Sequence, residues 1–182
     1  MQRDEAIILL KSHVTGEGLI NHCIATSAIM KAAAARLGED QDEWELIGIL
    51  HDIDFEETGG DMTIHGAEGY RILIDAGIPE EIAGPVKRHN YEVYGDPETL
   101  VDTVLTAADN ISGLIVACAL VKGGEVSAVS GKTVRKKMKD RSFAAGCSRE
   151  RIMMIEEYIG LPEFYEIAVE GVKTVKDEVG LS

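Results

Sequence analysis

Apolar residues recur along the chain at intervals of three and four positions, which is the spacing of one face of an α-helix. In residues 17–37, Leu19, Cys23, Thr26, Met30 and Leu37 follow this spacing, and the four alanines at 32–35 favour a helix further. The same pattern predicts helices over about 3–13, 41–53, 65–76, 79–89, 98–121, 131–139, 148–159 and 162–179. No segment alternates clearly in the manner of a strand, so we predict an all-α fold.

Glycines separate the predicted helices, and Pro79 and Pro162 fall where the first turn of a helix tolerates proline. Residues 125–131 have an ambiguous pattern. The chain contains no internal repeat and no linker long enough to divide it, so we predict a single domain over residues 1–182.

The composition limits the partners that we expect. The chain has 182 residues and a formal charge of −14, which opposes binding to extended nucleic acid or to an anionic membrane. Its cysteines, Cys23, Cys118 and Cys147, form no CxxC pair, which disfavours a disulfide framework and a thiolate zinc site. The N-terminal residues do not resemble a signal peptide, and the longest apolar run, 113–121, is far shorter than the roughly 20 residues of a membrane span. We therefore expect a soluble cytoplasmic protein.

Several polar residues fall on or beside the apolar helix faces. Each alone has an ordinary explanation, such as a core histidine, a helix cap or a hydrogen-bonded His-Asp pair. Together they form a set of imidazoles and carboxylates, which are ligands for divalent iron, manganese, zinc or magnesium, and helices that face one another can bring such groups together. The candidate metal ligands are His22, His51, Asp52, His65, His89 and Asp109.

The order of these residues resembles the HD superfamily of metal-dependent phosphohydrolases. A histidine on one helix, an adjacent His-Asp pair and a later aspartate match His22, His51-Asp52 and Asp109, while "IHGAEGYRIL" and "VKRHN" resemble the two additional histidine segments of members with binuclear sites. The resemblance covers about residues 18–120 and implies a helical bundle with a metal site in its core cleft, followed by a helical extension over about 125–182.

The resemblance also implies the chemistry. One or two divalent ions (Fe, Mn, Mg or Zn) would be held with Asp52 between them and would activate water for attack on a phosphate. Asp54 is a candidate for orienting a ligand or for acting as general base, and a solvated acid at a helix end is an equally good interpretation of it. The sequence lacks the lysine of the HDIG group and the Gly-Tyr-Pro segment of cyclic-di-GMP phosphodiesterases.

The leading interpretation is therefore a phosphohydrolase for a nucleotide or another small phosphorylated compound. Compared with the HDIG group and the cyclic-di-GMP phosphodiesterases, the six-ligand pattern is more similar to that of the small HD enzymes that hydrolyse dinucleoside polyphosphates. It is shared with HD-type di-iron oxygenases, so an oxygenase remains an alternative, as does a non-catalytic regulatory domain that binds a metal or a nucleotide. The sequence does not indicate the oligomeric state.

Basic residues concentrate in one segment of this acidic chain. Residues 131–151 contain eight lysines and arginines against two acidic residues. A solvated helical face is the usual explanation for such a run. The alternative is that one face of the predicted helix, formed by Lys132, Arg135, Lys136 and Lys139, leans over the metal cleft and binds a substrate phosphate.

Overall fold

The structure is a computed structural model that describes residues 1–182, and all of its regular elements are helices, which confirms the predicted all-α class. The α-helices are α1 (Arg3–His13), α2 (Glu17–Leu37), α3 (Gln41–Leu50), α4 (Ala67–Asp75), α5 (Glu80–Arg88), α6 (Tyr91–Tyr94), α7 (Leu100–Leu120), α8 (Gly131–Met138), α9 (Arg149–Met153) and α10 (Leu161–Thr174). Two 3-10 helices, η1 (Val126–Ala128) and η2 (Met154–Glu157), complete the set.

Most predicted helices occur, but several bounds differ. Helix α3 ends at Leu50, because the chain enters a series of turns from His51 onward. The helix predicted over 148–159 is divided into α9 and η2, and α10 ends at Thr174, before the predicted 179. Helix α6 was not predicted, because four residues are too few to show a periodic pattern.

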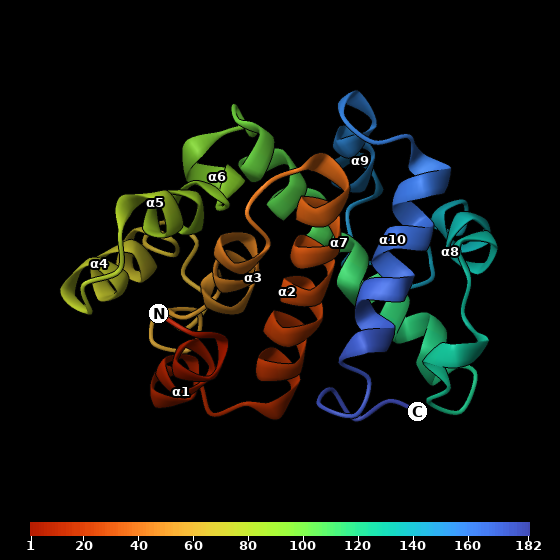
Figure 1. The fold of residues 1–182 in the computed structure, drawn as a ribbon, viewed down its shortest axis with the longest axis horizontal. Coiled ribbons are helices and arrows are strands. Elements are labelled where there is room, and N and C mark those ends of the chain that lie inside the picture. The colour runs from red at the N-terminus through yellow and green to blue at the C-terminus, as the bar shows by residue number, and fades with distance from the viewer.

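Helix α2 occupies the centre of the molecule and packs against α3, α7 and α10 (Figure 1). Two glycines allow its close neighbours to approach. A Cβ atom on Gly48 of α3 would lie 2.4 Å from the Cα of Ser27, and one on Gly171 of α10 would lie 2.8 Å from the carbonyl oxygen of Ala28. These distances leave no room for any side chain, so the glycines fix how closely α3 and α10 flank α2.

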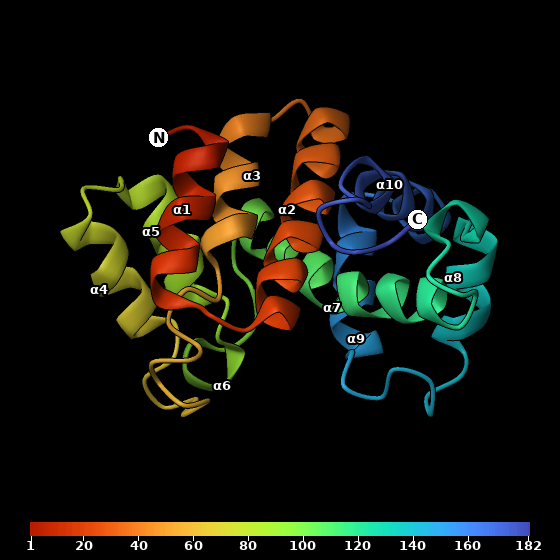
Figure 2. The same ribbon diagram turned by 90° about the horizontal axis from the view of Figure 1, so that it is seen from below.

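The remaining helices lie on either side of this centre. Helices α1, α3, α4 and α5 lie on one side of α2, and α8 and α10 lie on the other, while α7 passes behind α2 and reaches both sides (Figures 1 and 2). One continuous cluster of 46 buried apolar residues runs from Ala6 to Leu181. The C-terminal helices therefore share a hydrophobic core with the N-terminal ones.

Helix α7 is long and apolar enough to cross a membrane by length and composition, with a mean hydropathy of 1.6 over its best 18-residue window. However, 67% of that window is buried inside the protein. Helices α2, α9 and α10 pack against α7 and cover most of its apolar surface.

Candidate metal centre

The structure brings all six predicted metal ligands together, although they come from distant parts of the chain. Two lie within helices, one in the second turn of α2 and the other in the middle of α7. The other four lie at or beyond helix ends, where the chain turns. In chain order the six are His22, His51, Asp52, His65, His89 and Asp109.

The carboxylate of Asp52 lies at the middle of the cluster. Its Oδ2 atom is 3.4 Å from His51 Nε2 and 3.7 Å from His22 Nε2. Its Oδ1 atom is 3.4 Å from His65 Nε2 and 3.3 Å from His89 Nε2. The two oxygens of one carboxylate therefore face two different pairs of histidines.

The cluster divides into two possible metal-binding groups that share Asp52. His22, His51 and Asp52 form one, and Asp52, His65 and His89 form the other, with the ligand atoms of each group within 4.8 Å of one another. Asp109 adds an oxygen to the first group, because its Oδ1 atom is 3.0 Å from His22 Nε2. The two groups could each hold a divalent ion, with Asp52 as a shared ligand.

The outer ring nitrogens of two histidines are held by the helices that they terminate. His51 Nδ1 lies 2.9 Å from the carbonyl oxygen of Gly48, and His89 Nδ1 lies 2.5 Å from that of Val86. A carbonyl only accepts, so each Nδ1 carries the proton and donates, and each Nε2 turns its lone pair toward the cluster. The end of α5 is also fixed to α7, because Arg88 donates to both oxygens of Asp102 at 2.9 and 3.0 Å.

His22 is oriented by a serine that the sequence did not indicate. Ser112 donates its hydroxyl proton to the carbonyl of Asp109 at 2.8 Å, so its oxygen accepts from His22 Nδ1 at 3.1 Å. Ser112 and Asp109 are three residues apart on α7, so one turn of this helix supplies both a ligand and the group that orients another ligand.

Asp54 orients His65. Its carboxylate is fully buried and accepts hydrogen bonds from His65 Nδ1 at 2.9 Å and from the backbone N–H groups of Gly66 and Gly69, both at 2.8 Å. The interpretation as a solvated acid is therefore wrong. Because both oxygens are engaged and none faces the cavity, the structure favours the orienting role over that of a general base.

Glycines make this arrangement possible. Gly66 has a φ of +80°, and a Cβ atom there would lie 2.7 Å from the carbonyl oxygen of Lys87. A Cβ atom on Gly69 would lie 3.2 Å from the carboxyl carbon of Asp54. The two glycines of "HGAEG" thus let the start of α4 approach both α5 and Asp54, and the sequence motif marks a backbone requirement as well as a ligand.

The donor set fits divalent cations. His51 Nε2 is buried and has no hydrogen-bond partner, which is costly for a polar atom. His65 Nε2 and His89 Nε2 are 3.0 Å apart, and two lone pairs would repel one another at that distance unless a proton or a cation lies between them. Imidazole and carboxylate ligands with ordered outer hydrogen bonds are typical of sites for first-row divalent ions.

In the absence of ions, protons stabilise the cluster. Burial lowers the pKa of His65, but hydrogen bonds and charge from Asp52 and Asp54 outweigh it and raise this pKa to about 9. Burial likewise opposes a charge on His51, yet the charge of Asp52 places the pKa of His51 well above its usual value. Burial raises the pKa of Asp52, while the His51 charge and hydrogen bonds from His65 and His89 take it well below its usual value. Protons and metal ions therefore compete for the same nitrogens.

Four of the six candidate ligands line a cavity of about 200 Å³. Asn90 holds one wall in place, because its amide donates to the carbonyl oxygens of Met62 at 2.7 Å and His65 at 2.9 Å. Two partly exposed aromatic side chains, Phe55 and Tyr91, lie among the lining residues. The lining consists of Asp52, Phe55, Met62, His65, His89, Asn90, Tyr91 and Asp109.

The predicted phosphate-binding face does not reach this cavity. Helix α8 packs against α10 and the C-terminal half of α7, on the far side of α2 from α4 and α5 (Figures 1 and 2). Lys132 and Lys136 line a separate cavity beyond the end of α7, and Arg135 and Lys139 line a third cavity beside α10. The expectation that this face leans over the metal cleft is corrected, because the helix that carries it packs elsewhere.

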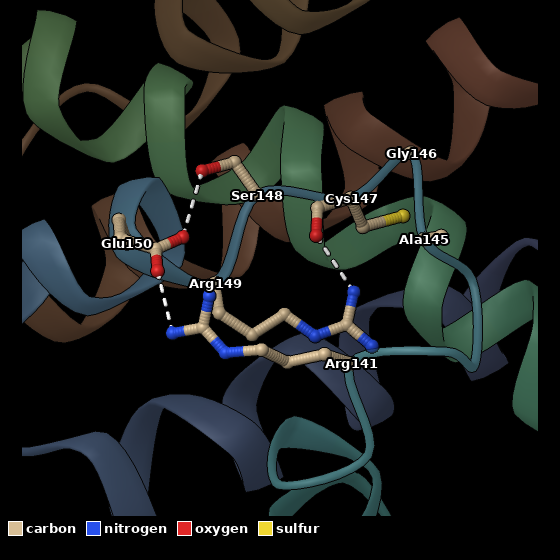
Figure 3. Close-up of a pocket in the computed structure, with 7 residues that line it drawn as sticks. All are labelled: Arg141, Ala145, Gly146, Cys147, Ser148, Arg149 and Glu150. Carbon is tan, nitrogen blue, oxygen red and sulfur yellow. Dashed lines mark hydrogen bonds and ion pairs between the residues drawn. The ribbon is translucent and has the colours of Figure 1, made fainter.

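Two other arginines of the basic segment have structural partners (Figure 3). Arg149 is buried and donates to the carbonyls of Cys147 at 2.6 Å and Ala144 at 2.8 Å, and it also bonds the carbonyl of Phe143. Arg141 pairs with Glu150 at 2.7 Å on the surface. Arg149 therefore organises the turns that precede α9, where backbone carbonyls would otherwise lack partners.

Comparisons with known proteins agree with this geometry. A family model described as the HD domain matches residues 19–114, a range that contains all six candidate ligands. Ribonuclease Y from Protochlamydia amoebophila (strain UWE25) is 26% identical over an alignment of 175 residues, which covers 90% of this chain and 32% of that relative. The chain thus spans about a third of the length of this curated relative. No solved structure matches the chain.

Proposed function

The chain belongs to the HD domain family, and we propose that it is a metal-dependent phosphohydrolase that acts on a nucleotide or another small phosphorylated compound. The observation that carries the proposal is the position of Asp52, whose two oxygens face two separate pairs of histidines. A site of this kind would hold two divalent cations, and paired cations are used by enzymes that hydrolyse phosphate esters.

The residues divide into those that would hold the ions and those that fix these ligands. His22, His51, Asp52 and Asp109 would hold one ion, and His65 and His89, with Asp52, would hold the other. Divalent ions at such a site lower the pKa of water toward about 7 and neutralise phosphoryl oxygens. Ser112 and Asp54 keep the imidazoles in the orientation and tautomer that this binding requires.

The cavity supports a small substrate. Its volume of about 200 Å³ fits a phosphate group and part of its leaving group. Phe55 and Tyr91 line the cavity and could contact an apolar or planar part of the substrate. The name of the matched relative describes a ribonuclease, which supports hydrolysis of a phosphoester. The formal charge of −14 opposes a long polynucleotide as substrate.

Metal analysis combined with a phosphate-release screen tests the proposal. The protein is purified anaerobically and assayed with manganese, iron or magnesium against nucleoside mono-, di- and triphosphates, dinucleoside polyphosphates and a short RNA. We expect bound metal and release of phosphate or nucleotide from at least one small compound. Asp52→Asn should lose both, whereas Asp75→Asn, which changes an exposed surface acid, should lose neither.

Other outcomes identify the alternatives. Hydrolysis that persists in Asp52→Asn, or a wild-type protein that binds no metal, would contradict the proposal. Metal binding with oxygen consumption and no hydrolysis would instead indicate an oxygenase. Metal binding with neither reaction, even at high protein concentration, would indicate a regulatory domain.

A further inference from the structure

One arginine of the basic segment lies beside the metal cavity. The guanidinium carbon of Arg151 is 3.4 Å from the ring centroid of Tyr91, and Tyr91 lines the cavity together with Asp52 and Asp109. This contact joins α9 to α6, two elements that are far apart in the chain. The basic segment 131–151 was expected to supply a cation to the cavity from α8. It instead places Arg151, which lies on α9, near the cavity.

Hydrogen bonds fix α9 next to the metal ligands. The backbone N–H of Ser148 donates to the side-chain oxygen of Asn110 at 2.9 Å, and Asn110 follows Asp109 on α7. The hydroxyl of Ser148 in turn accepts from the N–H of Arg151 at 3.3 Å. These bonds tie the first turn of α9, which carries Arg151, to Asn110, the residue next to the candidate ligand Asp109.

The guanidinium of Arg151 lacks adequate partners. Its Nη1 atom is buried without any hydrogen-bond acceptor, and only 14% of the side chain is exposed. Its one ion pair is a long contact of 3.4 Å from Nη2 to Asp96, a carboxylate whose side chain is 76% exposed. Native proteins rarely leave a buried donor unpaired, and where they do a ligand or a functional role is a common reason.

An anionic ligand would complete this arrangement. The lining of the cavity contains carboxylates and histidines but no lysine or arginine, and Arg151 reaches its edge by stacking on Tyr91, which is one of the lining residues. The planar fork of an arginine matches phosphate oxygens, and stacking on an aromatic ring leaves its edge available for hydrogen bonds. Tyr91 is 44% exposed and lines the cavity, so the stacked pair lies at the rim of the cavity.

We propose that Arg151, held by the ring of Tyr91, binds the phosphate oxygens of the substrate at the edge of the metal cavity. This inference rests on the proposed function and adds a residue that determines substrate affinity. Arg151 would contribute mainly to binding, because it lies at the rim and not among the metal ligands.

Substitution of Arg151 tests this inference. Arg151→Met keeps a side chain that can pack on Tyr91 but removes the charge and the donors. For the substrate found in the release screen, we expect KM to rise by about tenfold to a hundredfold, which is the usual effect of losing a hydrogen bond to a charged group, with a smaller change in kcat. Arg151→Lys should lie between Arg151→Met and the wild type. Arg141→Met is the matched control, because it removes an exposed arginine of the same segment, and KM should not change.

A binding measurement separates this inference from the proposed function. Titration of inorganic phosphate into the manganese-loaded protein by calorimetry needs no turnover, and Arg151→Met should weaken this binding by the same factor while its metal content and circular dichroism match those of the wild type. Phosphate affinity and KM within about twofold of the wild type in Arg151→Met would overturn the role of Arg151. A wild-type protein that binds no metal, or that hydrolyses none of the compounds in the screen, would instead contradict the proposed function.

Discussion

The metal centre and the basic segment show two opposite relations between sequence and space. The ligands of the metal centre are spread from His22 to Asp109, yet the fold brings them within a few ångströms of one another. The basic residues lie close together in the sequence, within residues 131–151, yet the fold distributes them over a surface helix, a buried turn and the edge of the metal cavity.

The difference follows from burial. In the metal centre, the Nδ1 atom of each of the four histidines has a partner, which is a backbone carbonyl, Ser112 or Asp54. On α8, Lys132 and Lys136 are exposed, so water can solvate their ammonium groups and they need no fixed partner. Charged groups that converge in the buried interior therefore indicate a binding site. A run of like charges along the sequence does not by itself indicate one.

Removal of one buried ligand should have the largest effect. His51→Ala deletes a fully buried ligand that faces both Asp52 and Asp109. We expect the metal content to fall by at least one ion per chain and hydrolysis to fall to background, measured by metal analysis and phosphate release. His13→Ala, which removes a histidine that pairs with Glu57 outside the cluster, should retain both. Full metal content in His51→Ala would contradict the assignment of this ligand.

A substitution behind the ligands should have an intermediate effect. Asp54→Asn replaces one acceptor oxygen by an N–H₂ group, so at least one of the bonds from His65, Gly66 and Gly69 is lost. Changes to such outer partners typically weaken metal affinity by about 10- to 100-fold, and we expect this result in a competition titration with a chelator. Asp61→Asn is the control, since the side chain of Asp61 bonds Thr63 at the surface and contacts no candidate ligand side chain. Unchanged affinity in Asp54→Asn would show that His65 needs no fixed partner.

Metal removal should reveal a pH dependence of stability. The pKa of His65 is raised to about 9 in the metal-free fold, above the value of about 6.5 expected when unfolded. The stabilisation is therefore complete below pH of about 6.5 and is lost as the pH rises through about 9. Asp52 and Asp109 have lowered pKa values, so their contributions stay constant over this range.

Thermal unfolding measures this effect. With chelator present, Tm should fall by at least about 2–4 °C between pH 6.5 and 9, which corresponds to about 1 kcal/mol for a chain of this length. With manganese present the fall should be smaller or reversed, because metal binding requires neutral imidazoles and strengthens as they deprotonate. A metal-free protein whose stability rises over this range would contradict the assignment of protons to the cluster.

Charge reversal on α8 should have the smallest effect. Lys132→Glu and Lys136→Glu alter exposed residues that line a cavity separate from the metal centre. We expect KM and kcat to stay within about twofold and the free energy of unfolding to change by no more than about 0.5 kcal/mol, as is usual at the surface. A rise in KM of more than about tenfold would show that α8 does contact the substrate.

Much of the fold could be predicted because the spacing of apolar residues along the chain indicates a helix locally. The bounds of α2 match the predicted range, since its buried face runs through Cys23, Thr26 and Met30. The pattern failed where local information was short or weak. Helix α6 has four residues, and the chain from His51 to Gly66 forms turns whose course depends on the bonds of Asp54 and Asn90.

The sequence by itself determined the helical class and the types of residue available for a metal site, because helix periodicity and side-chain chemistry are local properties. Only the tertiary structure decided how these residues meet. The close crossings at Gly48 and Gly171 set the positions of α3 and α10 against α2, and the packing of α8 and α9 carries Lys136 away from the cavity and Arg151 toward it. Such outcomes depend on contacts between residues distant in the chain, which no local pattern encodes.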